Sequence, residues 1–388
     1  MDRSPLERSH DNPRTNSRSF QVWVPFSVSS PSRTAHESLS LGWNVNRPRP
    51  GVNRACNDAS FPLRMIRNQV ASRTQPERAA TWKAESSERQ ILHLRTALLD
   101  SGSHLDVSQR ARASTNLANT LLVVGRYVDA LEEFERACSL AGDDGMAAAN
   151  RGATRRAYAR CVPDDGHARF LLHHAAESLE HGLARSLDDD RTRAHFAAML
   201  VATREALGSW RPSDPTRREN LRAAEREYRA WALRERLFLN PLNDIGGLPL
   251  AARDPLSLIS MTTAVGEPPL WFAFLNAMKQ EYVSSRFMLY RGTTQSEAHY
   301  SDKDVTIVNT LDYPSHRLGT EEVKSALRCA YSVLDKIAVF VNAYFGLGKK
   351  PKKVHFRTVW YENAETEQLH PRLLSLQNAP LRGLFWIS

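Results

Sequence analysis

The stretch from residue 111 to residue 141 constrains the fold of this 388-residue chain most, because it contains two helical patterns joined by a tight turn. The apolar face of the first pattern consists of Leu117, Ala118 and Leu121. After the Gly125-Arg126 turn, Ala130, Phe134 and Ala137 recur at the i, i+4 and i+7 positions of a second helix. Small residues at these positions let two antiparallel helices approach closely, while the aromatic ring fills the groove between them. The pattern predicts a helical hairpin.

The run G-R-Y-V-D-A-L-E-E-F-E-R-A at residues 125–137 resembles the turn and second helix of a tetratricopeptide repeat (TPR). A second unit begins near Gly145, although residues 161–167 interrupt the repeat period. Residues 168–185 and 191–207 have the pattern of further, degenerate helices. At least three stacked units are needed to bury a continuous core. We therefore expect a TPR-like helical array over residues 81–210.

The resemblance to TPR proteins implies a protein or peptide partner in the concave groove of the array. Asn119 and Asn150 fall where some TPR proteins place asparagines that hydrogen-bond the backbone of a bound peptide. Thr115 stands where the carboxylate-binding version has Lys, which argues against that version. The alternative interpretation is that both asparagines are ordinary polar residues on the helix surface.

The positive charge of the chain is concentrated at its N-terminus. Residues 1–80 contain 12 Arg, no Lys and 6 acidic residues, so they supply +6 of the net charge of +9. Because this segment shows no sustained hydrophobic period, we expect a disordered basic tail, the alternative being an RNA-tethering arm. The rest of the chain is nearly neutral, so a strongly basic globular domain is excluded.

The remaining composition indicates a cytoplasmic protein. No run of 18 apolar residues is present, so no membrane-spanning helix is expected. The four cysteines are far apart and form no Cys-x-x-Cys pair, which argues against a disulfide scaffold or a zinc module. The N-terminus has no secretory signal pattern.

One group of residues in the array has the spacing of metal ligands. His174, Glu177 and His181 share one helix face, with His173 beside them. No neighbouring helix offers a closing ligand, and the flanking residues are charged. We therefore interpret this face as solvated and expect no metal and no other cofactor.

A polar segment at residues 211–219 predicts a linker to a second helical domain over residues 220–388. Its first helix is expected over residues 219–239, ending before Pro241. An apolar helix is expected near residues 269–280. Residues 287–318 form a mixed stretch in which Val305 to Val308 are candidates for a short strand. Thr320 is then expected to cap a long helix over residues 321–345.

That long helix carries a polar stripe on an otherwise apolar background. Its predicted core face consists of Val323, Leu327, Ala330, Tyr331, Leu334, Ile337, Ala338, Val341 and Phe345. Arg328, Asp335 and Asn342 recur every seven residues, with Lys336 beside them. Either Arg328 and Asp335 form an ion pair, or the stripe faces a partner helix, a dimer interface or an active site.

Two segments follow this helix. The Lys cluster at residues 349–353 is a candidate phosphate contact or, by our preferred interpretation, a solvated loop. Residues 355–362 are aromatic and are expected to pack in the core.

Four motifs resemble a bacterial, TPR-associated subfamily of the HEPN superfamily. They are LNPLND at residues 239–244, AYSVLDKIAVFVNAYF at 330–345, FRTVWY at 356–361 and LRGLFWIS at 381–388. The resemblance implies an all-helical bundle that often dimerises and is often a metal-independent RNase. The activity requires an Arg that neutralises a phosphate, followed after four to six residues by a His that acts as acid or base at the ribose 2′-hydroxyl.

No Arg-x(4–6)-His motif occurs after residue 220. We therefore expect a chain that lacks the C-terminal end of the domain and its nuclease activity, with core residues such as Trp386 left exposed. The supporting part of the site is assigned to Arg328, Asp335, Lys336 and Asn342. The leading hypothesis is a relative of HEPN endoribonucleases of stress or phage-defence systems, with a homodimer formed through this domain. The alternative is a non-catalytic module that binds RNA or protein.

Overall fold

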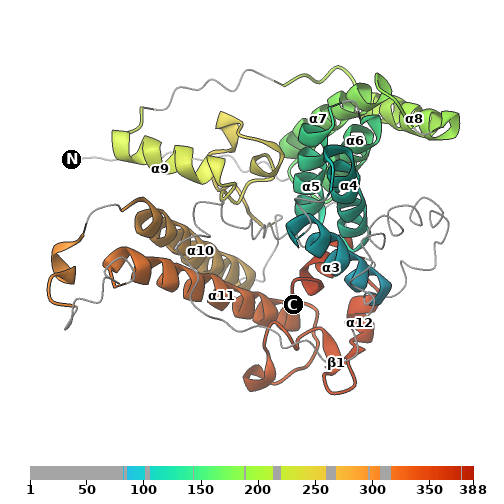
Figure 1. The fold of residues 1–388 in the computed structure, drawn as a ribbon. Helices are drawn as coiled ribbons and strands as arrows, with labels where there is room; N and C mark the ends of the chain where they lie inside the picture. Colours follow the sequence, from blue (N-terminus) through green and yellow to red (C-terminus); the bar gives the residue numbers. More distant parts are fainter. Residues whose placement is uncertain are drawn as a thin grey trace, which may run out of the picture.

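The computed structural model describes residues 82, 85–100, 105–142, 144–187, 189–212, 220–258, 268–295, 298–305, 316–376 and 378–388. These residues form eleven α-helices, several short 3-10 turns and one two-stranded hairpin, so the prediction of an all-α fold is confirmed. Helices α3–α8 stack together, and α9–α13 form a second group beside them (Figure 1). No helix among the described residues is long and apolar enough to cross a membrane. The predicted tail and most of the predicted linker lie outside the described residues.

The helical array comprises six helices whose starts are set by the sequence. They are α3 (Glu85–Asp100), α4 (Val107–Val123), α5 (Tyr127–Leu140), α6 (Gly145–Ala159), α7 (Asp165–Leu183) and α8 (Asp190–Leu207). Four of them begin after an aspartate whose carboxylate accepts a backbone N–H of the first turn: Asp106, Asp144, Asp164 and Asp189. Such caps satisfy donors that the helix cannot pair itself, so each one fixes where a helix begins.

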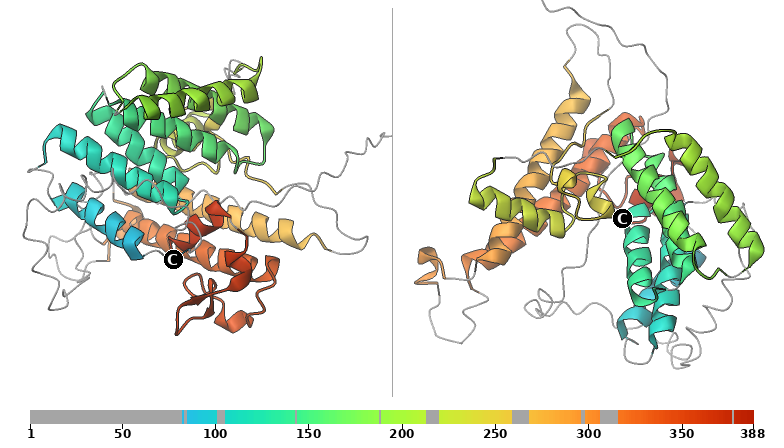
Figure 2. Two further views of the ribbon diagram at one scale, coloured as in Figure 1. Left: turned by 90° about the vertical axis from the view of Figure 1, so that its right-hand side faces the viewer. Right: turned by 90° about the horizontal axis from the view of Figure 1, so that it is seen from above.

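The core of the array is built from small residues. Ala118, Ala130, Phe134 and Ala137 have no exposed surface, as the hairpin pattern predicts. In the next hairpin, a Cβ atom placed on Gly152 would lie 2.8 Å from the carbonyl oxygen of Ala175. The backbones of α6 and α7 are therefore in direct contact. Figure 2 shows the successive helices stacked side by side. This arrangement is compatible with a TPR-like array.

The connection from α6 to α7 contains the residues that interrupt the repeat period. Cys161 and Val162 are buried there against Leu242 and Ile245, which belong to the C-terminal half of the chain. The interruption therefore contributes a docking surface between the two halves.

Helix α9 (Ala223–Arg234) ends earlier than the sequence predicts. The cause is Arg236, which has a positive φ of 57°. The N–H of Arg236 donates to the carbonyl of Leu233, and the N–H of Leu237 donates to the carbonyl of Ala232. These two bonds form a C-terminal cap in which Arg236 has the left-handed conformation. The helix therefore ends before the chain reaches Pro241.

Helix α10 (Leu270–Thr294) is longer than predicted, and residues 287–294 are helical rather than mixed. Its C-terminal half is supported by the neighbouring helix α11 (Leu318–Tyr344). The Ser285 hydroxyl donates to the carbonyl of Ala326, and a Cβ atom on Gly292 would lie 2.5 Å from the carbonyl oxygen of Gly319. The close approach of α11 therefore sustains a helix that the local pattern does not predict. Most of the strand candidate at residues 305–308 lies outside the described residues.

Helix α11 begins two residues before Thr320, so the predicted cap is wrong. The first turn is capped by a residue distant in sequence. The Leu318 N–H donates to the carboxylate of Asp302 at 3.1 and 3.2 Å. Because Asp302 is 16 residues away, local sequence gave no sign of this contact.

The predicted core face of α11 is confirmed in its second half and wrong in its first. Ile337, Ala338 and Val341 are buried, whereas Leu327 is 60% and Tyr331 is 65% exposed. Helix α10 packs along α11, and Leu327 and Tyr331 lie on a side of α11 that remains exposed. The apolar pattern there consequently faces outward.

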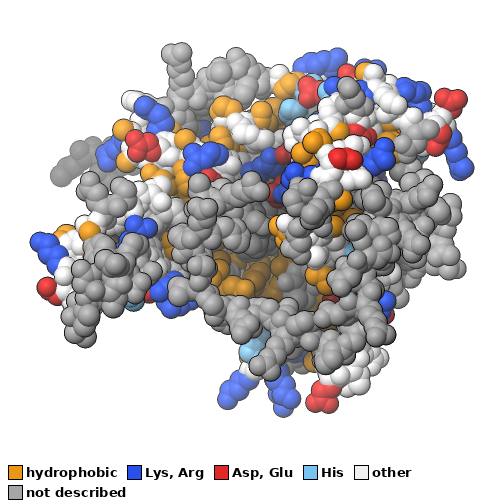
Figure 3. All heavy atoms as spheres, in the orientation of Figure 1, with side chains coloured by type: hydrophobic (Ala, Val, Ile, Leu, Met, Phe, Trp, Pro, Cys, Tyr) orange, Lys and Arg blue, Asp and Glu red, His pale blue; other side chains and the backbone are white. Residues whose placement is uncertain are grey.

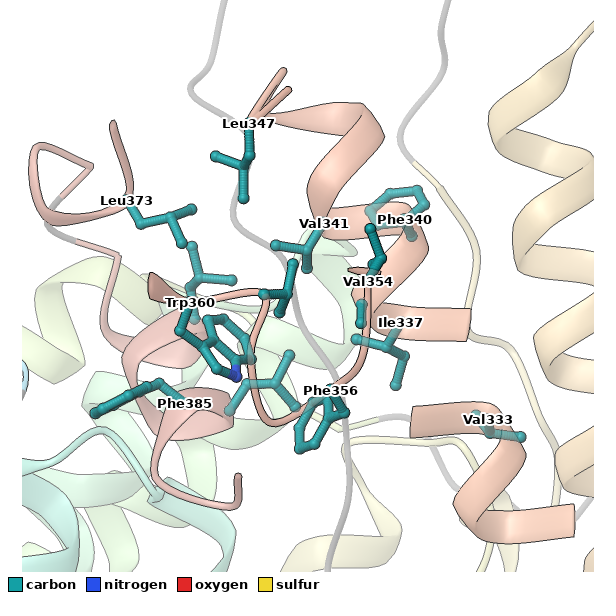
Figure 4. Packing of buried hydrophobic residues seen from close by; sticks show 14 of the residues in the cluster. Val333, Ile337, Phe340, Val341, Leu347, Val354, Phe356, Trp360, Leu373 and Phe385 are labelled. Atoms are coloured by element: carbon teal, nitrogen blue, oxygen red, sulfur yellow. The ribbon is translucent and has the colours of Figure 1, made fainter. Parts of the chain in front are cut away.

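The chain after α11 folds back to form an aromatic core. It contains β1 (Tyr361–Asn363), β2 (Gln368–Leu369), α12 (Pro371–Leu374) and α13 (Ala379–Phe385). Phe356, Val359 and Trp360 are buried, which confirms the prediction for residues 355–362. Figure 4 shows Trp360 between Phe385, Phe356 and the side chains of α11.

The predicted exposure of Trp386 is wrong. The residue is half-buried, and its indole N–H donates to the carbonyl of Trp82 at 2.8 Å. Trp82 precedes α3 in sequence, yet it lies 4% exposed in the aromatic core of the C-terminal region. The two halves of the chain therefore share one core at this point.

Candidate functional site

The polar stripe of α11 lies on the surface. Arg328 and Asp335 are exposed, and Asn342 and Lys336 are half-buried. Within the described part of the chain, Arg328 and Asp335 form no ion pair with each other, so the proposed internal pair is wrong. Two of its members, Asp335 and Asn342, instead contact the loop that follows the helix.

Asp335 and Asn342 hold that loop. The Phe356 N–H donates to Asp335 Oδ1 at 3.1 Å. The side-chain amide of Asn342 donates to the carbonyl of Lys349 at 3.0 Å and accepts from its N–H at 3.1 Å. Gly346 allows the chain to reverse here because its φ is 58°, and the helix ends at Tyr344, one residue before the predicted boundary. Two residues of the stripe therefore position the segment from 346 to 356.

Lys336 has a different role, because it points to α10. Its ammonium donates to the carboxylate of Glu281 and, at 2.9 Å, to the hydroxyl of Ser332. Partial burial acts to raise the pKa of Glu281, but the hydrogen bonds from Lys336 and Ser332 and the charge of Lys336 together outweigh it, so the pKa is lowered. Lys336 thus links α10 to α11 and does not hold the loop. Among the described residues, Arg328 contacts neither Glu281 nor the loop.

The loop held by Asp335 and Asn342 carries a row of cations that we call the basic ridge. Its members are Lys349, Lys350, Lys352, Lys353, His355 and Arg357. All but the half-buried Lys349 are exposed, and they alternate with Val354 and Phe356, which enter the core. Basic side chains project at the lower edge of the face in Figure 3, over the loop that follows α11 in Figure 1.

In the described residues, no member of the ridge pairs with a carboxylate. Four lysines and one arginine are therefore concentrated without neutralisation. Such a row favours a polyanion, because each cation that contacts a phosphate releases condensed counterions. The solvated-loop interpretation is correct for exposure, but it overlooked that the loop is fixed to the polar stripe.

The candidate metal ligands of the array form an ordinary surface cluster. Glu177 contacts His174 at 2.8 Å and His173 at 3.3 Å. Burial lowers the pKa of His174, an effect that Glu177 partly offsets. In the part of the chain described, no group of three potential ligands is close enough to hold a metal ion.

The two asparagines of the predicted groove lie on α4 and α6, and both are half-buried. The Nδ2 atom of Asn150 is buried and has no hydrogen-bond partner among the described residues. A buried donor without a partner is costly, so this amide is a candidate for a contact with an additional molecule.

A cavity of about 300 Å³ lies between α9 and α10, lined in part by Tyr228, Phe238, Asp254 and Arg286. Its charges already have partners. Arg286 donates to both carboxylate oxygens of Asp254 at 2.8 Å and to the Tyr228 hydroxyl at 2.8 Å, and it stacks on Phe238. This bidentate pair anchors α9 and the loop before α10 to α10. We interpret it as structural.

The array is joined to the C-terminal half by a buried hydrogen bond that was not apparent from the sequence. Tyr158 of α6 donates to Asp244 Oδ2 at 2.5 Å, and both residues are buried. Burial raises the pKa of Asp244 to about 7, although Tyr158 and Arg236 act in the opposite direction. The residues are 86 positions apart, so only the fold reveals them as partners.

Comparison with known proteins identifies the C-terminal region. Residues 262–388 match the sequence model of the family described as LA2681-like HEPN. This match covers α10, α11, the basic ridge, the hairpin and α13. The predicted membership of this region in the HEPN superfamily is therefore confirmed. No curated protein and no solved structure matches the chain.

Proposed function

We propose that this chain is an RNA-binding HEPN protein whose helical array recruits a protein partner, and that it is related to metal-independent endoribonucleases of stress or phage-defence systems. The observation that carries the proposal is the basic ridge, an unneutralised row of cations within the residues that match the family. Asp335 and Asn342 fix the ridge, which reduces the entropy lost when a polyanion binds.

Binding, rather than cleavage, is the activity assigned to these residues. Cleavage needs a general acid or base at the ribose 2′-hydroxyl, paired with a cation at the phosphate. On the ridge, His355 precedes Arg357 by two residues, which does not match the spacing of the family motif. The same preparation is therefore assayed for RNA cleavage in EDTA, where we expect none.

The test measures anisotropy of a fluorescein-labelled 20-nucleotide single-stranded RNA between 50 and 300 mM KCl. In Lys352→Ala/Lys353→Ala, we expect several-fold weaker binding at 100 mM and a salt slope reduced by roughly 1.4, since each phosphate contact on a single strand contributes about 0.7. Both lysines are exposed, so folding should be unaffected.

The matched control is Lys303→Ala. Lys303 is also exposed, but it lies before the start of α11, about 40 Å of helix away from the ridge. It should bind as the wild type does. Equal affinity and salt slope in the ridge variant and the wild type would overturn the proposal, as would equal losses in the ridge variant and Lys303→Ala.

For the array, Asn119 and Asn150 are proposed to contact the partner. The unpaired amide of Asn150 supports this assignment. An array of immobilised peptides with free and amidated C-termini tests it. Asn119→Ala/Asn150→Ala should lose the peptides that the wild type retains; retention of the same set by both proteins would contradict the assignment.

Association of two copies is proposed through the first half of α11. Leu327 and Tyr331 are exposed there, one turn apart. Light scattering after size exclusion should show a dimer for the wild type and a monomer for Leu327→Glu/Tyr331→Glu. Leu92→Glu on α3 is the matched control, because Leu92 is 63% exposed in the array. A monomeric wild type would contradict this proposal.

A further inference from the structure

Helix α13 touches the helical array through backbone atoms. A Cβ atom on Gly383 would lie 2.4 Å from the carbonyl oxygen of Gly125, and one on Gly125 would lie 2.1 Å from the carbonyl oxygen of Ala379. Gly125 is the turn residue between α4 and α5 and has a φ of 88°. Neither position has room for a side chain. The turn and α13 therefore cannot slide past each other, and any relative movement must separate them. Figure 2 shows this C-terminal helix between the array and the end of α11.

The opposite side of α13 packs against the segment that carries the basic ridge. The ring of Phe385 meets the ring of Trp360 at 6.0 Å, and Trp360 meets Phe356 edge-on at 5.7 Å. Figure 4 shows the ring of Trp360 between the rings of Phe385 and Phe356. The Phe356 N–H is the group held by Asp335. His355 and Arg357, on either side of Phe356, are members of the ridge.

The junction around the two glycines is incompletely filled. A cavity of about 40 Å³ remains there, lined in part by Tyr127, Tyr158, Gly383 and Ile387. The buried Nε atom of Arg382 has no hydrogen-bond partner among the described residues. The unfilled space beside the glycines and the unpaired donor make this contact easier to open than the aromatic core on the other side of α13.

We infer that α13 couples the α4–α5 turn of the array to the basic ridge, by way of Phe385, Trp360 and Phe356. When α13 leaves the turn, Trp360 loses one wall of its site, and the segment 354–361 is loosened with it. A molecule that binds near the turn therefore changes the order of the ridge. The coupling is a property of the fold, and only its effect on RNA rests on the proposed function.

Hydrogen exchange tests the coupling without RNA. Gly383→Ala forces a Cβ atom into the Gly125 carbonyl, whereas Gly142→Ala is the matched control because nothing lies within 4 Å of that position. In Gly383→Ala, we expect exchange to accelerate about tenfold in residues 354–361, together with residues 124–128. The control should exchange as the wild type does. Acceleration confined to residues 124–128 and 379–387, or no acceleration, overturns the inference.

Ile387→Ala provides a milder variant if Gly383→Ala fails to fold. It enlarges the cavity beside the turn without a backbone clash, and the same two segments should respond together to a smaller extent. The RNA anisotropy assay is then repeated with whichever variant folds, and we expect several-fold weaker binding. If the wild type binds no RNA, the proposed function fails, while the exchange result still decides the coupling. If exchange responds but RNA affinity does not, the ridge is not regulated through α13.

Discussion

The array and the C-terminal region bury their cores in opposite ways. In the array, alanines and glycines bring neighbouring helices into backbone contact, as Gly152 does against Ala175. In the C-terminal region, large rings such as those of Trp82, Phe340, Trp360 and Phe385 fill the space between segments that are distant in sequence. The first core depends on the absence of side-chain volume, and the second depends on its presence. The two regions should therefore fail under opposite kinds of substitution.

Removing volume should have its largest effect in the C-terminal region. Trp360 has no exposed surface, so Trp360→Ala is expected to lower the free energy of unfolding by about 3–5 kcal/mol. Urea denaturation followed by near-ultraviolet circular dichroism measures this loss. Leu376→Ala is the control in the same region, because Leu376 is 42% exposed and should cost little. Equal midpoints for the two variants would contradict an aromatic core.

Adding volume should harm the array. In Gly152→Ala, the new methyl group meets the Ala175 carbonyl and the Leu179 side chain at 2.8 Å, which we expect to cost about 1–3 kcal/mol. Gly142→Ala adds the same methyl group in open space within the same array and should change stability by less than about 0.5 kcal/mol. Far-ultraviolet circular dichroism during urea unfolding gives both values. A stabilised Gly152→Ala would show that α6 and α7 are not in backbone contact.

The junction between the regions differs from both cores because it buries a titratable pair. Asp244 holds a proton up to a pKa of about 7 in the folded chain, against an ordinary value of 3.8. The folded state therefore binds the extra proton between these values, and the free energy of unfolding falls as the pH rises from about 4 to 7, then levels off. Each unit of pKa difference is worth about 1.4 kcal/mol, so we expect a decline of at least about 1 kcal/mol.

Asp244→Asn isolates this effect. An amide can still accept the Tyr158 hydrogen bond but does not titrate. Urea midpoints for both proteins between pH 4.5 and 8 give the difference in stability at each pH. That difference should change up to about pH 7 and stay constant above it. A difference that is the same at every pH would show that Asp244 is charged throughout in the folded chain.

Local sequence was enough to predict the helical hairpins and the HEPN resemblance of the C-terminal region. The positions of Ala118, Ala130, Phe134 and Ala137 follow from a 3.6-residue period, and that period directly specifies the face that a neighbouring helix covers. The end of α11 at Gly346 is equally local, because few residues other than glycine adopt its positive φ. The HEPN resemblance was based on four motifs, of which those at residues 330–345, 356–361 and 381–388 lie within the matched region.

The candidate site was only partly predictable. The sequence selected Asp335 and Asn342 by their spacing, but assigned them to the supporting part of an active site and treated the Lys cluster separately. The structure joins them, because the chain reverses at Gly346 and returns its backbone to the stripe. Spacing along a helix reports which side chains share a face, but it cannot report what covers that face.

Only the tertiary structure decided the contacts between segments far apart in the chain. Asp302 caps α11, Asp244 meets Tyr158, Gly383 meets Gly125, and Trp82 enters the core formed by Trp360 and Phe385. None of these pairs leaves a local periodicity, since each depends on how the elements are placed rather than on how the chain is patterned within them. Hydrophobic period and helix propensity act over a few residues. The burial of a side chain, in contrast, depends on which surface the fold places against it.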